Sequence, residues 1–172
     1  PLNMPGTLFI EGDKVNLRTI EEEDIEFLRD NINDPEIRKF LTSKTPKNLE
    51  QERGFFEDVI SGDEDVNLAI SKDEEMIGIV SLDDKPDYMR TAEIGIWIAP
   101  EHHGNGYGTE SAELITEYGF NELNYHRIMG LAYESNKGSQ RIWEKLGFEK
   151  EGELREHVYR DGDFEHAYVY GI

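Results

Sequence analysis

The chain has 172 residues, of which 37% are hydrophobic and 33% charged, and it contains no cysteine. This length predicts one domain over residues 1–172, with an ordered core from about residue 8. The missing cysteines exclude disulfides, a thiolate nucleophile and cysteine-ligated metal sites. A net charge of −20, with 38 acidic against 18 basic residues, disfavours nucleic-acid binding. Because no apolar run is long enough to cross a membrane and the first residues lack the basic-then-apolar pattern of a signal peptide, we expect a cytoplasmic protein without a membrane partner.

The surplus of acidic residues has two interpretations. It is a means of attracting a cationic substrate through the field of the whole protein, or it is a general adaptation for solvation, such as life in high salt. The acids are spread along the chain, for example at residues 21–24, 63–65, 73–75 and 149–153. This distribution favours the solvation interpretation.

The first third of the chain predicts a strand followed by short amphipathic helices. Residues 15–18 alternate between apolar and polar side chains, which is typical of a strand. Three helix starts follow: a capping-box pattern from Thr19, the pair Asp34-Pro35, and an Asn48 cap. They predict helices over residues 19–31, 35–41 and 48–60.

The middle of the chain holds its most informative stretch. Residues 66–71 and 76–82 flank a polar turn and predict a hairpin. Residues 92–99 are apolar, β-branched and aromatic, which predicts a mostly buried strand ending at Pro100. Three glycines at alternate positions and a helix pattern over residues 107–123 come next; the glycines are Gly104, Gly106 and Gly108.

A strand, a glycine-rich turn and a helix start together form a device for holding phosphate. Glycines let the backbone approach closely, while free N–H groups and the helix dipole attract the anion. The alternative is an ordinary connection that happens to be rich in glycine. A Walker loop is excluded because no Gly-Lys-Ser/Thr ending is present, and a dinucleotide fingerprint fits poorly because the loop lies past mid-chain.

The remainder predicts two more helix-and-strand units. Residues 127–133 form a strand, residues 136–146 a helix stopped by Gly147, and residues 148–154 and 164–170 the last strands, joined across the turn Asp161-Gly162. The whole order predicts an α/β (α+β) fold, with a mixed central sheet of about seven strands and helices on both faces.

Several strings at matching spacing resemble one enzyme family. HHGNGYGTE is similar to the pyrophosphate-binding motif Q/R-x-x-G-x-G/A of the GNAT N-acetyltransferases, with His103 where Gln or Arg is usual. AEIGIWIAPE, NYHRI and NKGSQRIWEKLGFEKEG resemble the RimJ/RimL-like branch, which acetylates protein N-termini. The resemblance covers nearly the whole chain in the right order. It implies the single-domain GNAT fold.

The function implied by this resemblance is direct transfer of an acetyl group from acetyl-CoA, the co-substrate, to a primary amine. The acceptor implied first is a protein N-terminal amine. The alternatives are a small amine (a polyamine, an amino acid or an aminoglycoside-like compound) or a binding module that holds acyl-CoA without turnover. No metal is expected, since no histidine spacing is typical of a zinc site. The sequence does not determine the oligomeric state, and a homodimer is one candidate.

The resemblance also assigns residues to the cofactor. Backbone groups of the loop would hold the pyrophosphate, and a free amide near Trp97 or Ile98, on a strand that splays from its neighbour, would face the acetyl oxygen. Asn136 would bond the pantetheine arm, and as a helix cap it serves a compatible second purpose. The loop residues are His103, Gly104, Asn105, Gly106, Tyr107, Gly108 and Thr109.

Two residues are implied for proton transfer. Glu93, a carboxylate on an apolar strand where burial would raise its pKa, is the candidate general base; the alternative is a solvated or salt-bridged carboxylate. Ser139 would pass a proton to the leaving thiolate. The family's usual general acid is a tyrosine four residues after this serine, where this chain has Trp143. An indole N–H cannot act as an acid at neutral pH.

Overall fold

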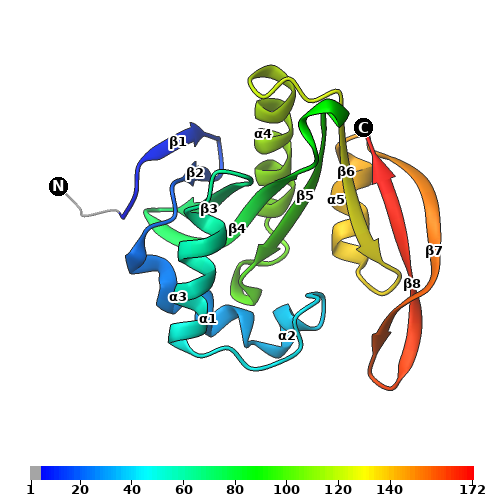
Figure 1. Cartoon of the computed structure of the whole chain (residues 1–172), viewed down its shortest axis with the longest axis horizontal. Coiled ribbons are helices and arrows are strands. Elements are labelled where there is room, and N and C mark those ends of the chain that lie inside the picture. The colour runs from blue at the N-terminus through cyan, green and yellow to red at the C-terminus, as the bar shows by residue number, and fades with distance from the viewer. Residues whose placement is uncertain (1–4) are drawn as a thin grey trace.

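The computed structural model describes residues 5–172, which form one mixed eight-stranded sheet with helices on its faces (Figure 1). The strand order is β1-β2-β3-β4-β5-β6-β8-β7, and only the β5–β6 pair is parallel. The strands are β1 Leu8–Glu11, β2 Asn16–Arg18, β3 Val66–Lys72, β4 Glu75–Asp84, β5 Thr91–Ile98, β6 Arg127–Tyr133, β7 Glu149–Arg160 and β8 Asp163–Gly171. The α-helices are α1 Ile25–Ile32, α2 Pro35–Arg38, α3 Leu49–Phe55, α4 Tyr107–Asn121 and α5 Lys137–Lys145.

The sheet has one strand more than the seven that the sequence predicts. The extra strand, β1, is a four-residue edge strand with mostly exposed side chains. Its sequence therefore lacks the alternation of apolar and polar residues that predicts a strand. Strand β7 also extends to Arg160, well past the predicted end at residue 154. Its register shifts twice against β8, and such bulges break the period of two on which a strand prediction rests.

The predicted helix starts are confirmed at two of three sites. The side chain of Asp34 accepts from the Glu36 N–H, and Asn48 forms a capping box with Gln51. The third start was wrong by two residues, because the capping box is formed by Glu21 and Asp24 rather than from Thr19. The helices also end differently: α2 stops at Arg38, and α3 passes into a π-helical turn over Phe56–Ile60.

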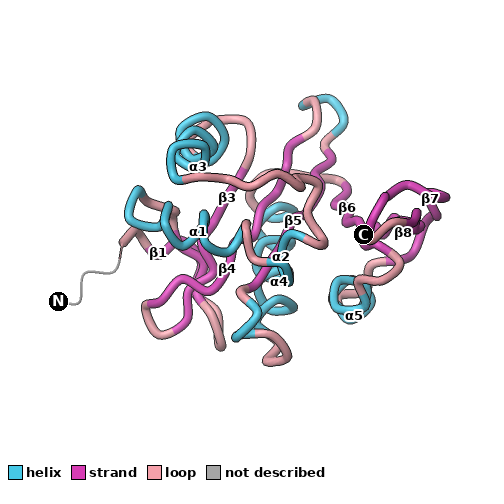
Figure 2. Tube along the Cα trace, turned by 90° about the horizontal axis from the view of Figure 1, so that it is seen from below, coloured by secondary structure: helices cyan, strands magenta, loops and turns pink. Residues whose placement is uncertain are grey.

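The core is divided by the sheet into two clusters. The larger cluster packs α4 and α5 against the strands, and the smaller one packs α1 and the π-helical turn. Figure 2 shows α3 on one side of the strands and α4 and α5 on the other. Alternate residues of β5 therefore serve different faces: Ile94 and Ile98 join the larger cluster, while Trp97 joins the smaller. No helix within residues 5–172 has the length and hydropathy needed to cross a bilayer.

Candidate active site

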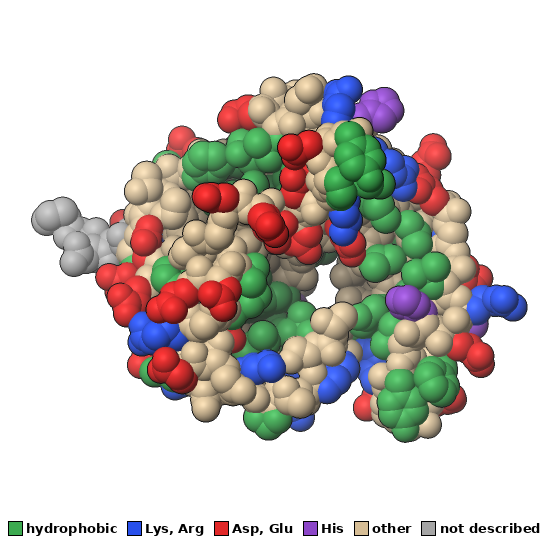
Figure 3. Space-filling view, viewed as in Figure 1, with side chains coloured by type: hydrophobic (Ala, Val, Ile, Leu, Met, Phe, Trp, Pro, Cys, Tyr) green, Lys and Arg blue, Asp and Glu red, His purple; other side chains and the backbone are tan. Residues whose placement is uncertain are grey.

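The two parallel strands at the centre of the sheet separate halfway along their length. β5 and β6 pair from Thr91 with Arg127 to Ile94 with Gly130, yet the strands continue to Ile98 and Tyr133. Figure 1 shows them together at the top and apart toward the bottom, and Figure 3 shows an opening through the molecule in the same region. The splay that the family resemblance implies is therefore present.

The pairing pattern decides which backbone groups face the opening. Ala99 N donates to Ile77 O at 2.8 Å, and Lys85 N donates to Thr91 O at 3.2 Å, so odd-numbered β5 residues bond β4. Because peptide groups alternate along a strand, those of Ile96 and Ile98 point toward β6. Of the two predicted positions for a free amide, the strand geometry favours Ile98 over Trp97. The Trp97 side chain stacks on Phe27 of α1, with ring centroids 6.0 Å apart.

The glycine-rich loop joins the separated end of β5 to α4. Gly104 and Gly106 have φ values of 78° and 81°, a region that favours glycine, and Gly106 is the N-cap of α4. The first helical bond runs from Glu110 N to Gly106 O, at 3.1 Å. The N–H groups of the first turn therefore have no partner within the helix; this turn contains Tyr107, Gly108 and Thr109.

Side chains of the loop brace its backbone. His103 Nε2 lies 2.6 Å from Ile98 O, and since a carbonyl only accepts, this ring nitrogen donates. The Asn105 amide donates to the carbonyls of His102 and His103, at 3.2 and 3.1 Å. His103 thus ties the loop to the end of β5 from the position where the family motif has Gln or Arg. Gly108 allows close packing, because a Cβ there would lie 3.1 Å from Ile142 Cδ1 of α5.

Two lysines that no motif predicted lie beside this loop. Lys14 Nζ is 3.4 Å from Asn105 O and would be 2.9 Å from a Cβ at Gly106. Lys72 Nζ lies 5.5 Å from the centre of the Tyr107 ring and pairs with Asp73 at 3.2 Å. Glu110 Oε2 holds the Lys14 segment in place by accepting from the N–H groups of Lys14 and Val15, at 2.7 and 2.8 Å. The loop therefore has local positive charge as well as free N–H groups, despite the acidity of the chain.

Helix α5 begins on the other side of the opening. Asn136 is its N-cap, and its side chain accepts from Ser139 N at 3.1 Å. Ser139 is half-buried in the first turn. Trp143 lies one turn further along and is 1% exposed; its Nε1 donates to Leu131 O of β6 at 3.3 Å. The residue in the position of the family's tyrosine is therefore part of the core.

Glu93 lies on β5, on the sheet face that carries α1 and α3. Its side chain is half-buried, at 29% exposure, and lies 3.6 Å from Lys85 Nζ, which agrees with the salt-bridged alternative for this carboxylate. Asp83 is directly opposite on β4. Asp83 is exposed at its surface, but partial desolvation by the surrounding protein, followed by the charge of Asp65, raises its pKa, and Glu93 adds to the shift. A group of carboxylates rather than a single buried one therefore occupies this face.

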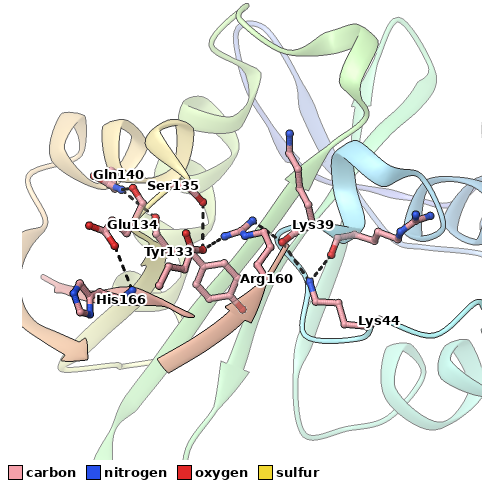
Figure 4. A network of polar contacts seen from close by, with 10 residues as sticks. Lys39, Lys44, Tyr133, Glu134, Ser135, Gln140, Arg160 and His166 are labelled. Carbon is pink, nitrogen blue, oxygen red and sulfur yellow. Dashed lines mark hydrogen bonds and ion pairs between the residues drawn. The ribbon is translucent and has the colours of Figure 1, made fainter. Parts of the chain in front are cut away.

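The far end of the opening is bounded by Tyr133 and Arg160. The Arg160 guanidinium lies 4.9 Å from the centre of the Phe40 ring and 5.4 Å from that of Tyr133, and it donates to Lys39 O at 2.7 Å and pairs with Glu165 (Figure 4). Burial raises the pKa of Tyr133, with the Arg160 charge opposing the shift. A pocket of about 370 Å³ lies here, lined by Lys39, Phe40, Ser135, Arg160, Asp163 and Phe164.

The residues that sequence reasoning missed share one property. Lys14, Lys72, Asp83 and Arg160 are brought to the site by contacts distant in sequence, and no local pattern marks them. Asp83 and Asp84 directly follow the predicted strand 76–82, and because aspartate is depleted in strands they indicate a loop, whereas β4 continues to Asp84.

Comparisons with known proteins agree on one family. A family model described as "Acetyltransferase (GNAT) domain" matches residues 14–149. The uncharacterized N-acetyltransferase YoaA of Bacillus subtilis is 29% identical over 95% of each chain. Spermidine N(1)-acetyltransferase of Escherichia coli is 28% identical over 89% of this chain and 82% of its own. The Vibrio cholerae spermidine N-acetyltransferase, solved in complex with CoA and spermine, has a TM-score of 0.87 at 24% identity, over 94% of this chain and 96% of its own.

Proposed function

The chain belongs to the GNAT acetyltransferase family, and on that premise we propose that it transfers the acetyl group of acetyl-CoA to a primary amine of a small polycation such as a polyamine. One observation carries the proposal: β5 and β6 separate beside a glycine-rich helix start. The opening offers strand amides to an extended arm, and the helix start offers N–H groups to an anion. This combination suits a cofactor with a pyrophosphate and a long amide-containing arm.

Each part of the loop has a place in this proposal. Backbone groups from His103 to Thr109 hold the pyrophosphate, with Lys14 and Lys72 adding positive charge. The N–H of Ile98 faces the thioester oxygen, where negative charge grows during attack. Asn136, at the start of α5, lies on the side of the pantetheine arm.

The carboxylates opposite this loop support a cationic acceptor. Asp83 and Glu93 face one another on β4 and β5, and Asp65 immediately precedes β3; desolvation, followed by the charges of Asp65 and Glu93, raises the pKa of Asp83. A polycation entering here would relieve that repulsion. The similarity to two spermidine acetyltransferases points the same way. These observations favour the small amine over the protein N-terminal amine that the sequence strings implied.

Direct transfer of the acetyl group requires only the amine, the thioester and two residues that move protons. The amine nitrogen attacks the thioester carbon, the new C–N bond forms as the C–S bond breaks, and CoA leaves as a thiolate. Glu93, adjacent to Asp83, takes the proton that the acceptor ammonium must lose. As the tetrahedral intermediate collapses, the nitrogen loses its second proton; Ser139 donates its hydroxyl proton to the thiolate and takes up that nitrogen proton in its place, and Glu93 releases its proton to solvent.

A thiol-release assay with acetyl-CoA and a panel of amines tests the proposal. We expect turnover with spermidine or spermine, with mass spectrometry showing a single acetylated amine, and much slower turnover with peptides bearing a free N-terminus. Preference for a peptide would return the acceptor to the protein N-terminal class. Tight CoA binding without turnover of any amine would support the binding module instead.

A further inference from the structure

Both β6 carbonyls that face the opening already accept hydrogen bonds from elsewhere. Leu131 O accepts from Trp143 Nε1 at 3.3 Å. Tyr133 O accepts from Gln140 Nε2 at 3.0 Å and from Asn136 N at 2.8 Å. Trp143 and Gln140 are both residues of α5, and Figure 4 shows the Gln140 amide directed at the end of β6.

The strand register shows which bonds these replace. Ile128 and Ile172 exchange two backbone bonds of 3.0 Å between β6 and β8, so odd-numbered β6 residues direct their peptide groups toward β5. If the parallel ladder continued beyond Ile94 and Gly130, Leu131 O would accept from Ile96 N and Tyr133 O from Ile98 N. The parallel ladder ends at the pair Ile94 and Gly130, so neither of these two bonds is part of it.

We propose that Trp143 and Gln140 are positioning residues that keep β5 and β6 apart by occupying the β6 carbonyls. The N–H groups of Ile96 and Ile98 are thereby left for the pantetheine arm and the thioester oxygen. This inference rests on the proposed function, since it concerns the same cofactor opening.

The packing around Trp143 fits this role. The indole lies directly on β6, where a Cβ at Gly130 would be 2.7 Å from Trp143 Cε2, so only glycine permits the approach. Phe148 packs on its other side, with ring centroids 5.2 Å apart. The substitution of tryptophan for the family's tyrosine thus exchanges a hydroxyl for a donor that bonds the strand.

Affinities for two ligands separate this role from simple packing. The ligands are CoA and adenosine 3′,5′-bisphosphate, which lacks the pantetheine arm. Trp143→Phe keeps an aromatic ring but removes the donor, and Gln140→Met does the same for the amide. For Trp143→Phe we expect the Kd of CoA to rise about tenfold, and for Gln140→Met to rise less, because Asn136 N still donates to Tyr133 O. The Kd of the nucleotide should stay within about twofold in both variants. Phe148→Leu is the matched control, because it loosens the same cluster without touching a β6 carbonyl: Tm should fall while the ratio of the two Kd values stays unchanged.

Hydrogen exchange gives a readout that packing alone would not move. Without ligand, the Ile96 amide of the wild-type protein should exchange quickly and slow on CoA binding. In Trp143→Phe it should already be protected without CoA, because Leu131 O has become free to accept it. Should that variant not fold, Gln140→Met tests the inference at Ile98. Because Asn136 N still donates to Tyr133 O in this variant, the Ile98 amide should become partly rather than fully protected without CoA.

The outcomes distinguish this inference from the proposed function. A wild-type protein that does not bind CoA would overturn the proposed function. A wild-type protein that binds CoA, together with folded variants whose CoA-to-nucleotide affinity ratio and Ile96 and Ile98 exchange are unchanged, would overturn only the positioning role.

Discussion

Glu93 and Asp83 face one another across β4 and β5, and this pairing changes the chemistry expected of either residue alone. Glu93 is half-buried, and its carboxylate lies 3.6 Å from Lys85 Nζ. Asp83 holds its proton more tightly than an ordinary aspartate, through desolvation and the charge of Asp65. If Glu93 is the base, as we propose, it acts next to a second carboxylate that can share a cationic acceptor.

Glu93→Gln tests the base directly. The amide keeps the shape of the side chain but accepts no proton, so kcat should fall by about 10²–10⁴-fold at neutral pH, while acetyl-CoA affinity stays nearly unchanged. The loss should shrink at high pH, where more of the amine arrives neutral. Wild-type kcat in this variant would show that Glu93 is structural and would direct attention to Asp83.

Asp83→Asn tests the raised pKa through stability. Because the folded protein binds this proton more tightly than the unfolded chain, stability is lost as pH rises through the raised pKa. Removing the ionisation should therefore raise Tm at pH 7 by roughly 1–3 °C, an effect limited by solvent screening. The difference in Tm should vanish well below the ordinary aspartate pKa of about 3.9, where Asp83 is protonated in both the folded and the unfolded protein. Asp87→Asn, an exposed change outside this group of acids, is the control; an equal gain there would attribute the effect to net charge alone.

The glycine-rich loop and the start of α4 act as one element. Free N–H groups come from the helix start, and the backbone turn comes from glycines at positive φ. Neither is sufficient alone, because a side chain in the turn would fill the space that the anion needs.

Gly106→Val should abolish CoA binding, measured by calorimetry with circular dichroism as a check on folding. A β-branched residue is strained at φ of 81°, and its Cβ would lie 2.9 Å from Lys14 Nζ. Gly162→Val is the matched control: Gly162 has φ of 90° in the β7–β8 turn, so it carries similar strain away from the loop. Equal loss of affinity in both variants would attribute the effect to strain rather than to the anion site.

Lys14→Met and Lys72→Met test the charges that flank the loop. Each should weaken CoA binding about three- to tenfold, because one partly solvated charge contact is removed. The salt dependence of CoA binding should become shallower in each variant. Unchanged affinity and salt dependence would leave the backbone as the sole source of binding.

At the scale of the whole molecule, a net charge of −20 influences both stability and encounter with the acceptor. Surface carboxylates repel one another, and dissolved salt screens that repulsion. The carboxylates near Glu93 show that part of this charge gathers at the proposed acceptor face, although most of it is spread over the surface.

One salt series separates the two interpretations of this charge. If acidity serves solvation, Tm should rise as ionic strength increases; if it steers a polyamine, kcat/KM for the acceptor should fall steeply over the same range. If both effects are observed, the charge serves solvation and also steers the acceptor. A flat response in each measurement would contradict both interpretations.

Local interactions explain which features could be predicted from the sequence. The strand, loop and helix over residues 91–121 were predicted because burial pattern, glycine spacing and helix start lie within one short segment. The caps at Asp34 and Asn48 were predicted for the same reason, since a cap bonds an N–H two or three residues away. The family, the mixed sheet and the position of the anion loop all follow from such short-range signals.

Contacts between segments distant in the sequence depend on the three-dimensional fold and could not be predicted. Strand β1 and the end of β7 are edge segments whose exposed side chains leave no periodic signal. Lys14 reaches Asn105, Asp83 faces Glu93, and Trp143 bonds Leu131 because strand register and helix packing bring them together. A backbone carbonyl such as Leu131 O has the same chemistry at every position in a sequence. Whether it bonds a strand or an indole depends on where the sheet opens, and this is decided by the packing of the whole fold.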